Sequence, residues 1–205
     1  LDGEPPIQDG ATIVIECTPL PLRARAAMFR DGIEAVIAPL KRVPPDALSP
    51  NAKINNYMNP MLAQREVTAI KPGAWALQLD MNGNLAEGVG CNVFFVRDGR
   101  VITPKADNIL PGVTRAVVLD LCRDNGIDVS EQDVSLHTAA TASEAFFTST
   151  SLCLCPVRSL NGRSYLGHAG PVTKRLMGLF TELVGCDYAA QYLAHLRSGT
   201  TRTGF

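Results

Sequence analysis

The clearest candidate for a reactive residue is Lys53. It is the only lysine between Lys41 and Lys71, and it lies in a locally uncharged run. A lysine among apolar and amide groups can lose its proton, which makes it a nucleophile for Schiff-base chemistry. Tyr57 follows four residues later and would lie beside Lys53 on a helix. Because lysine is mostly exposed in proteins, a solvated loop lysine next to a packed tyrosine is the ordinary alternative. The pair alone leaves both interpretations open.

A carboxylate, Glu87, lies between Ala86 and Gly88 in a segment with a β-strand pattern. A buried glutamate needs a partner, and a protonated ring nitrogen is one such partner. An exposed glutamate in a hairpin is the ordinary alternative. Glu87 is therefore a candidate ligand for a cationic ring only in combination with other groups.

Two polar segments have the chemistry of anion binding. The sequence Leu110-Pro-Gly-Val-Thr-Arg115 places a Pro-Gly loop before a helix. A helix N-terminus offers unpaired N–H groups and a positive dipole end to a phosphate. Thr148-Ser-Thr150 follows a predicted strand and offers hydroxyl and N–H groups, although it is also typical of a polar turn. One carboxylate and one phosphate-binding loop, close in sequence, are what a charged heterocyclic phosphate cofactor needs.

Composition and absent motifs exclude several classes of protein. The net charge of −1 over 205 residues does not favour a nucleic-acid or membrane-surface partner. There is no Gly-x-Ser-x-Gly elbow or Walker loop, and Gly88-Val-Gly90 lacks the third glycine of a dinucleotide fingerprint. The three histidines and six cysteines show no metal-ligand spacing, so we expect no metal site. Unpaired buried cysteines are typical of a reducing compartment, so we expect a cytoplasmic protein.

The elements that position these residues follow from turn signals and hydrophobic periodicity. Asn82-Gly83 and Asp98-Gly99 lie between apolar runs, which predicts an antiparallel meander through residues 75–104. Helical spacing predicts helices at residues 23–30, 59–70, 116–125, 138–142 and 171–184. β-branched or alternating runs predict strands at residues 11–17, 33–40, 127–134, 144–148 and 152–157. The fold class is therefore mixed α/β (α+β), with a strongly curved sheet enclosed by helices.

The order of the motifs resembles the class IV (fold type IV) pyridoxal-phosphate-dependent aminotransferases. This family includes branched-chain aminotransferases, D-amino-acid aminotransferases, (R)-selective amine transaminases and aminodeoxychorismate lyase. The matching segments run from residue 53 to about residue 184 and are Lys53-Ile-Asn-Asn-Tyr57, Glu87-Gly-Val-Gly-Cys-Asn-Val-Phe94, Thr103-Pro104, Leu110-Pro-Gly-Val-Thr-Arg115, Glu144-Ala-Phe-Phe-Thr-Ser-Thr150, Pro156-Val157 and Gly170-Pro-Val-Thr173. The ordered set is specific, although no single motif is.

The resemblance implies a role for each candidate residue. Lys53 would form the Schiff base with pyridoxal 5'-phosphate and then move the proton between the substrate Cα and the cofactor. Glu87 would keep the pyridine nitrogen protonated, so that the ring acts as an electron sink. Tyr57 would hydrogen-bond the phenolic oxygen of the ring. The phosphate would be held by the backbone of Val113 and Thr114 together with Ser149 and Thr150.

The resemblance also implies a D-amino-acid aminotransferase-like fold with two domains. Residues 1–50 would be the C-terminal portion of a small N-terminal domain and the interdomain loop, residues 51–197 the large domain that binds the cofactor, and residues 198–205 a mobile tail. Family members carry a phosphate-binding arginine in the small domain, and no arginine of residues 1–50 can be assigned this role from the sequence. The chain lacks an initiator methionine, so we expect a longer native chain.

The activity that the resemblance implies is transfer of an amino group between an amino acid, of branched-chain type, or a primary amine and a 2-oxo acid. Glu87-Gly-Val-Gly90 and the Asn56-Tyr57 pair favour the branched-chain and amine groups of the family. Two alternatives stay open, a pyridoxal-phosphate lyase of the aminodeoxychorismate lyase type and a non-catalytic remnant. The resemblance further implies a homodimer, with small-molecule substrates and no nucleic-acid or membrane partner.

Overall fold

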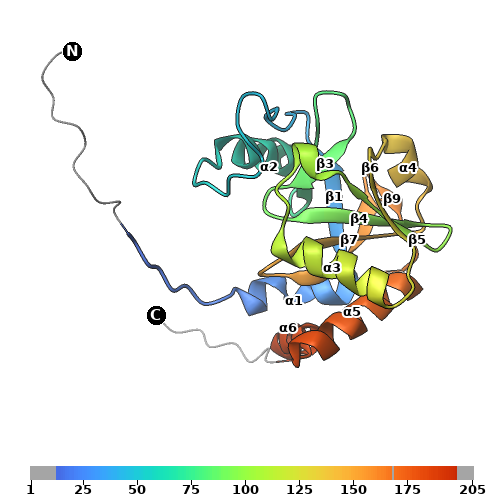
Figure 1. Cartoon of the computed structure of the whole chain (residues 1–205). Coiled ribbons are helices and arrows are strands. Elements are labelled where there is room, and N and C mark those ends of the chain that lie inside the picture. The colour runs from blue at the N-terminus through green and yellow to red at the C-terminus, as the bar shows by residue number, and fades with distance from the viewer. Residues whose placement is uncertain (1–12, 168, 198–205) are drawn as a thin grey trace, which may run out of the picture.

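The computed structural model describes residues 13–167 and 169–197, and within them one mixed sheet organises the chain (Figure 1). The strand order is β3-β2-β1-β8-β7-β4-β5-β6, with β9 paired to β8. The strands are β1 (Ile33–Ile37), β2 (Trp75–Leu79), β3 (Leu85–Gly88), β4 (Asn92–Arg97), β5 (Arg100–Pro104), β6 (Val129–Gln132), β7 (Glu144–Ser149), β8 (Cys153–Leu160) and β9 (Arg163–Ser164). The predicted mixed α/β class is confirmed.

Both predicted hairpin turns are present, but they do not form one meander. Gly83 and Gly99 adopt positive φ angles of 84° and 78°, and the turns join β2 to β3 and β4 to β5 as antiparallel pairs. Between the two hairpins lie β1, β8 and β7. In the described part, one isolated bridge joins Gly88, at the end of β3, to Cys91, the residue before β4. The continuous meander was the wrong prediction, because turn residues report local reversals and not which strands later pair.

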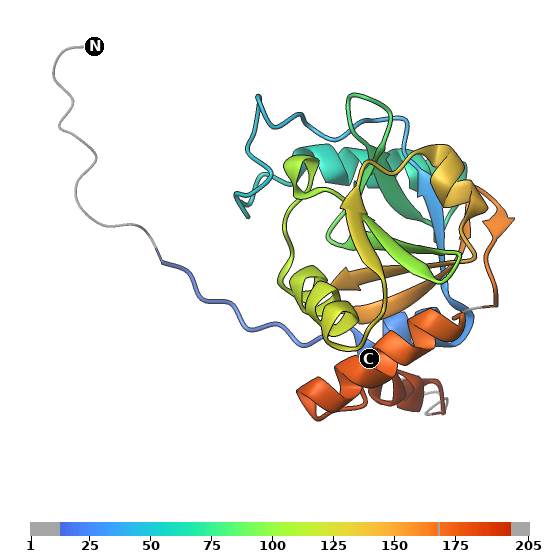
Figure 2. The same cartoon turned by 45° about the vertical axis from the view of Figure 1, so that its right-hand side comes forward.

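The sheet curls until its two ends approach each other (Figure 2). The N–H of Leu85, on the end strand β3, donates to the carbonyl of Val134, just after β6, at 2.8 Å. Phe94 and Phe95 of β4 and Phe146 and Phe147 of β7 are fully buried. Because successive strand residues point to opposite faces, Phe94 and Phe146 share one face of the sheet and Phe95 and Phe147 the other. The rings of Phe94 and Phe146 stack with centroids 4.9 Å apart. The curved sheet therefore carries well-packed aromatic side chains on both of its faces.

Six α-helices in the described part cover the sheet. They are α1 (Leu22–Asp31), α2 (Met58–Ile70), α3 (Val113–Asp124), α4 (Leu136–Thr141), α5 (Pro171–Val184) and α6 (Tyr188–Arg197), with a 3-10 turn η1 (Ala106–Asn108) before α3. α1 packs against α6, α3 against α5, and α2 against β2. In both views α1, α5 and α6 gather at one side of the sheet and α2 lies at the opposite side (Figures 1 and 2). All the predicted helices are present, and α6 was not predicted.

The helix α5 begins at a buried carboxylate. Glu144, 3% exposed, accepts the N–H groups of Val172 at 3.1 Å and Thr173 at 2.8 Å. A carboxylate suits the unpaired N–H groups and positive dipole end of a helix. A Cβ on Gly170 would lie 2.2 Å from Cδ of Glu144, so only glycine fits at the start of this helix. The cap joins β7 to α5 and explains why the predicted bounds of α5 are those observed.

The N-terminal part of the chain departs from the prediction at one strand. Residues 13–17 are exposed and form no strand, so the strand predicted there is wrong for the described residues, and residues 11 and 12 lie outside them. Phe29 of α1 and Ile33 of β1 belong to the same hydrophobic core as the later elements. Residues 22–37 therefore contribute to the hydrophobic core that the later elements form. The domain boundary at residue 50 stays a prediction, and residues 198–205 lie outside the described part.

No helix in the described ranges is both long enough and apolar enough to cross a membrane.

Candidate active site

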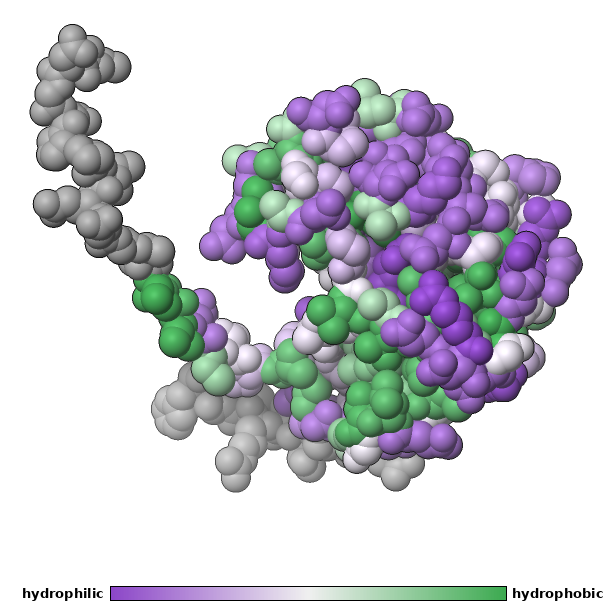
Figure 3. Space-filling model, in the orientation of Figure 1, coloured by the Kyte–Doolittle hydropathy of each residue, from purple (hydrophilic) through white to green (hydrophobic). Residues whose placement is uncertain are grey.

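The seven residues singled out from the sequence all line one cavity of about 350 Å³. They arrive on four segments: the loop before α2, strand β3, the N-terminus of α3 and the turn after β7. The residues are Lys53, Tyr57, Glu87, Val113, Thr114, Ser149 and Thr150. Figure 3 shows the molecule hollowed between the region of α2 and the region that carries α3. Segments separated by up to 97 residues (Lys53 to Thr150) thus meet at one place.

Lys53 and Tyr57 are adjacent, although no helix joins them. Nζ of Lys53 donates to the hydroxyl oxygen of Tyr57 at 3.1 Å, and the ammonium lies 5.8 Å from the centroid of the tyrosine ring. Helix α2 begins only at Met58, and a tight turn in which the N–H of Tyr57 donates to the carbonyl of Asn55 brings the two side chains together. Both are exposed, so Lys53 is a solvated loop lysine that lines the cavity, and it is not buried among apolar groups.

Amide side chains on α2 fix this helix against the sheet. Nδ2 of Asn59 donates to the carbonyl of Lys41 at 2.9 Å, and its Oδ1 accepts from Nε2 of Gln78 at 3.0 Å. Gln64 donates to the carbonyl of Ala74 at 2.8 Å and accepts the N–H of Ala76 at 3.0 Å. These bonds satisfy groups at the edge of β2, and they hold the N-terminus of α2 beside the cavity.

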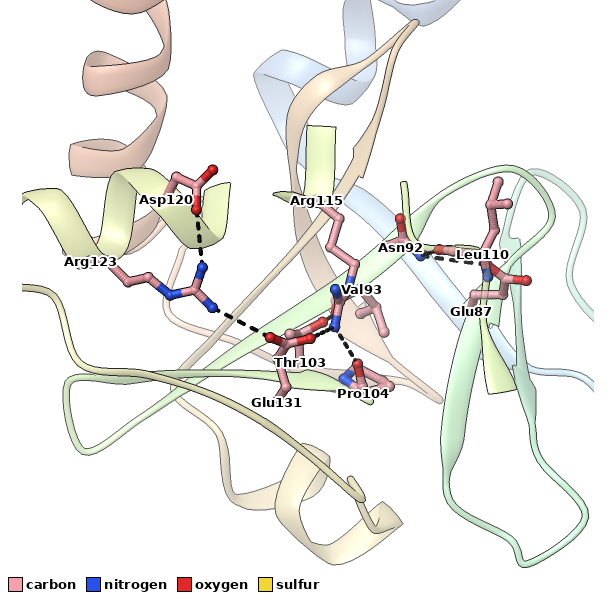
Figure 4. A network of polar contacts seen from close by, with 10 residues as sticks. All are labelled: Glu87, Asn92, Val93, Thr103, Pro104, Leu110, Arg115, Asp120, Arg123 and Glu131. Carbon is pink, nitrogen blue, oxygen red and sulfur yellow. Dashed lines mark hydrogen bonds and ion pairs between the residues drawn. The ribbon is translucent and has the colours of Figure 1, made fainter. Parts of the chain in front are cut away.

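Glu87 is buried and its carboxylate is held on three sides. Nε of Arg42 donates to Oε1 at 2.8 Å, and the N–H of Leu110 donates to Oε2 at 3.1 Å. Nδ2 of Asn92 lies 3.5 Å from Oε2, at the limit of a hydrogen bond (Figure 4). An ionised carboxylate offers about four acceptor positions. One position is therefore left for a donor that enters the cavity, and it lies on Oε1.

The protonation of Glu87 reflects a competition between burial and charge. Burial raises the pKa of Glu87 above the usual carboxylate value, while the Arg42 guanidinium, the Leu110 N–H and the Lys53 ammonium oppose this shift. Arg42 lines the same cavity, and sequence reasoning missed it. Its N–H donates to the carbonyl of Leu79 at 2.8 Å, which ties the chain after β1 to β2 and directs the side chain to Glu87. Nothing local in the sequence signals this contact across 45 residues.

The loop before α3 is fixed to the carboxylate end of the cavity. Nδ2 of Asn92 donates to the carbonyl of Leu110 at 2.8 Å, and a Cβ on Gly112 would lie 2.3 Å from Oδ1 of Asn92. Gly112 is the N-cap of α3, so Val113 and Thr114 form its first turn, where N–H groups have no intrahelical partner. The Leu110 backbone therefore joins Glu87 to an anion-binding helix N-terminus.

Arg115, the next residue of this motif, has a structural role. Its side chain is buried, and Nη2 donates to the carbonyl of Pro104 at 2.8 Å and to Glu131 at 2.7 Å. Figure 4 shows Arg115 directed to β5 and β6, apart from the group around Glu87. It anchors α3 to the sheet and does not line the cavity.

The turn after β7 supplies the second anion-binding segment. The side chain of Ser149 accepts the N–H of Leu152 at 3.1 Å, and Thr150 is exposed at the cavity. Thr148 lines the cavity as well, and its buried hydroxyl has no hydrogen-bond partner among the described residues. A buried polar atom without a partner is costly, and a ligand oxygen would satisfy it. Together with the unused position on Glu87, this donor set fits a phosphorylated ring cation.

In the described part of the chain, no group of three or more histidine, cysteine, aspartate or glutamate side chains is placed to hold a metal ion.

Comparison with known proteins adds an independent line of support. A family model described as amino-transferase class IV matches residues 3–160. The branched-chain-amino-acid aminotransferase of Escherichia coli K12 is 35% identical over 185 residues, which cover 86% of this chain and 59% of that protein. The enzyme of the same name from Pseudomonas aeruginosa is 40% identical over 136 residues, which cover 65% of this chain and 44% of its own length.

Solved structures agree with these sequence matches. The crystal structure of the E. coli branched-chain aminotransferase superposes with a TM-score of 0.71 at 35% identity and covers 75% of this chain and 51% of its own. The branched-chain aminotransferase of Thermobaculum terrenum, in its pyridoxal-phosphate form, gives a TM-score of 0.72 at 32% identity, with 83% and 56% covered. The chain thus spans about half the length of the relatives that it matches. From the family match, the sequence identity and the shared fold, we conclude that this chain belongs to the class IV aminotransferases.

Proposed function

We propose that this chain forms the catalytic part of a pyridoxal-phosphate-dependent aminotransferase. The enzyme moves an amino group between a branched-chain amino acid, or a primary amine, and a 2-oxo acid. The observation that carries the proposal is the convergence, at one cavity, of a lysine, a buried carboxylate with one unused acceptor position and two anion-binding segments. The names of the E. coli and P. aeruginosa relatives support the branched-chain substrate.

The geometry of the cavity allows a role for each of these residues. When bound, pyridoxal phosphate supplies a carbonyl group that condenses with amines and a ring that withdraws electrons from the substrate carbon. Glu87 would accept the N–H of the ring at its unused position, and Arg42 opposes the rise in the pKa of this carboxylate that burial causes. Val113 and Thr114 donate backbone N–H groups to the phosphate, and Ser149 and Thr150 complete its binding.

Lys53 is both the nucleophile and the proton carrier. When pyridoxal phosphate is bound, the amine of Lys53 would hold it covalently, and after the substrate amine has taken its place, Nζ would carry a proton from and to the substrate. Tyr57 accepts a hydrogen bond from this Nζ, so its own O–H proton is available to a ring oxygen of the cofactor. One hydroxyl therefore orients both the lysine and the ring.

The assembly and location belong to the same proposal. A homodimer is supported by the apolar side chains of Met58, Met61 and Leu62, which are 68%, 51% and 41% exposed on α2 beside the cavity. A cytoplasmic location is supported by six cysteines that are all unpaired.

The visible absorbance spectrum of the purified protein tests the cofactor and the lysine. After incubation with pyridoxal phosphate, we expect a yellow band that a branched-chain amino acid bleaches and a 2-oxo acid restores. Borohydride reduction should then leave the cofactor attached to the peptide that contains Lys53. Lys53→Ala should show no such attachment, whereas Lys105→Ala, an exposed lysine paired with Asp133, should behave as wild type.

The outcomes also separate the competing activities. If the protein turns over repeatedly without a 2-oxo acid and releases a cleaved product, it is a lyase instead. A protein that stays colourless and unlabelled would contradict the cofactor and favour a non-catalytic role.

A further inference from the structure

The turn at residues 149–152 is held from outside the cavity by two helices that are distant in the sequence. The hydroxyl of Tyr192, on α6, donates to the carbonyl of Ser151. Nη1 of Arg25, on α1, donates to the hydroxyl of Ser151 at 2.9 Å. The Ser151 hydroxyl in turn lies 3.4 Å from that of Ser149, which lines the cavity. Neither Tyr192 nor Arg25 lines the cavity, so neither contacts a ligand there directly.

The side chain of Tyr192 is buried in a cluster of aromatic rings. Tyr192 is 2% exposed, and its ring stacks on that of Phe29 with centroids 4.3 Å apart and planes inclined by 18°. Phe29 also meets the ring of Tyr188 edge-on at 5.9 Å. Figure 1 shows α1 and α6 side by side below the sheet, and they pack against each other. Because the ring is packed in this aromatic cluster, the hydroxyl has a fixed position from which it binds the carbonyl of the turn.

Arg25 brings a positive charge to the outer side of the turn. Among the described residues no carboxylate forms an ion pair with its guanidinium, so within this part of the chain no ion pair neutralises the charge. The charge reaches the cavity wall at Cys91: burial raises the pKa of that thiol to about 12, and Arg25 is one of the groups that oppose the shift. A positive charge that is not neutralised favours an anion on the other side of the turn.

We propose that Tyr192 and Arg25 are positioning residues that hold the 149–152 turn in the conformation that binds a phosphate group. The inference rests on the proposed function, because it requires this turn to bind the phosphate. It also reaches beyond the family match, because α6 lies outside the matched residues 3–160. The helix that ends the described chain would thereby set how tightly the cofactor is held.

A matched pair of tyrosines on α6 provides the test. Tyr188 and Tyr192 are both buried, and each donates its hydroxyl to a backbone carbonyl, Tyr188 to Leu154 in β8 at 3.1 Å and Tyr192 to Ser151. Tyr192→Phe and Tyr188→Phe remove the same atom. For each variant and wild type, the dissociation constants of pyridoxal phosphate and of pyridoxal, which lacks the phosphate, are measured by absorbance titration.

We expect Tyr192→Phe to weaken pyridoxal phosphate about three- to tenfold, the range for one lost hydrogen bond, and to leave pyridoxal unchanged. Tyr188→Phe should leave both dissociation constants unchanged, whatever it does to the melting temperature. Arg25→Met should also weaken pyridoxal phosphate selectively and reduce the salt dependence of its binding. Arg30→Met, on the same helix with its charge paired to Asp31, should do neither.

Two results would overturn the inference. One is that both tyrosine variants weaken pyridoxal phosphate equally, or that Tyr192→Phe weakens pyridoxal as much, since the effect would then be general destabilisation. The other is tight phosphate-dependent binding that neither Tyr192→Phe nor Arg25→Met alters. If wild type itself does not distinguish pyridoxal phosphate from pyridoxal, the phosphate role of the turn fails, and the proposed function loses that part together with this inference.

Discussion

The contact between Arg42 and Glu87 allows a sharp prediction, because it joins two nearly buried charges at the wall of the cavity. The side chains are 15% and 10% exposed, and Nε lies 2.8 Å from Oε1. Arg42→Met keeps much of the volume of the side chain and removes the charge and the donor. The ionised form of Glu87 then loses its main counter-charge, while the burial that disfavours it remains.

The size of the effect follows from the kind of bond. A hydrogen bond between charged groups contributes about 1.5–3 kcal/mol, so the ionised carboxylate should be destabilised by about this amount relative to the protonated one. Because only the ionised form accepts the N–H of a ring cation, we expect cofactor binding at neutral pH to weaken, by at most about ten- to hundredfold. Arg42→Lys, which keeps a charge but loses the fixed Nε, should lie between wild type and Arg42→Met.

The pH dependence has a definite sign. Burial raises the pKa of Glu87, so the folded protein binds this proton more tightly than the unfolded chain does. The contribution of Glu87 to folding stability is therefore present at acid pH and declines as pH rises through the carboxylate range. Removing Arg42 raises this pKa further. The stability lost in Arg42→Met should be greatest near neutral pH and should vanish at acid pH, where Glu87 is protonated in both proteins.

A double-mutant cycle decides whether Arg42 acts through Glu87. Urea unfolding and cofactor titration of wild type, Arg42→Met, Glu87→Gln and the double variant at several pH values give the coupling energy. We expect about 1.5–3 kcal/mol at neutral pH. Additive effects of the two substitutions, or an Arg42→Met penalty that does not change with pH, would refute the reasoning.

The remaining predictions concern caps, loops and turns. Glu144→Gln should lower the unfolding free energy by about 1.5–3 kcal/mol, and the melting temperature by about 3–12 °C, because the N–H groups of α5 lose a charged acceptor; an unchanged melting curve would contradict this. Asn92→Ala should weaken cofactor binding by about 1–3 kcal/mol, since the Leu110 carbonyl loses its buried donor, and titration checks this. Gly32→Ala should destabilise the fold by at least about 1–2 kcal/mol in thermal unfolding, because its φ is +78° and a Cβ would lie 2.9 Å from Cβ of Arg158. Gly178→Ala, in open space on α5, is its control and should stabilise by about 0.8–1 kcal/mol.

The sequence predicted those features that depend on residues close together in the chain. Helical periodicity and a following Gly185 located α5 to its observed bounds, and the Asn-Gly and Asp-Gly turns located two hairpins. The insertion of β1, β8 and β7 between those hairpins could not be predicted, because a local turn does not determine which distant strands pair. The seven cavity residues were found because each lies in a short motif. Their roles toward a cofactor stay proposals.

The residues that sequence reasoning missed act through contacts far apart in the chain. Arg42 meets Glu87 across 45 residues, and Tyr192 meets Ser151 across 41. Neither lies in a run with unusual composition, so no local pattern distinguishes them from ordinary loop and helix residues. Asn92 was read as part of a motif without a role, and its two contacts with the Glu87–Leu110 pair appear only in three dimensions.

The central place of β1 has a consequence for how the protein is made. Ala35 pairs with Trp75 on one side and with Leu160 on the other, both in parallel. During synthesis β1 emerges early, yet its second neighbour cannot reach it until more than a hundred further residues have been added. Such non-local pairing slows folding, and meanwhile the apolar strand leaves one edge open to other chains. Yield during expression should therefore depend on temperature and chaperones more than the stability of the finished protein suggests.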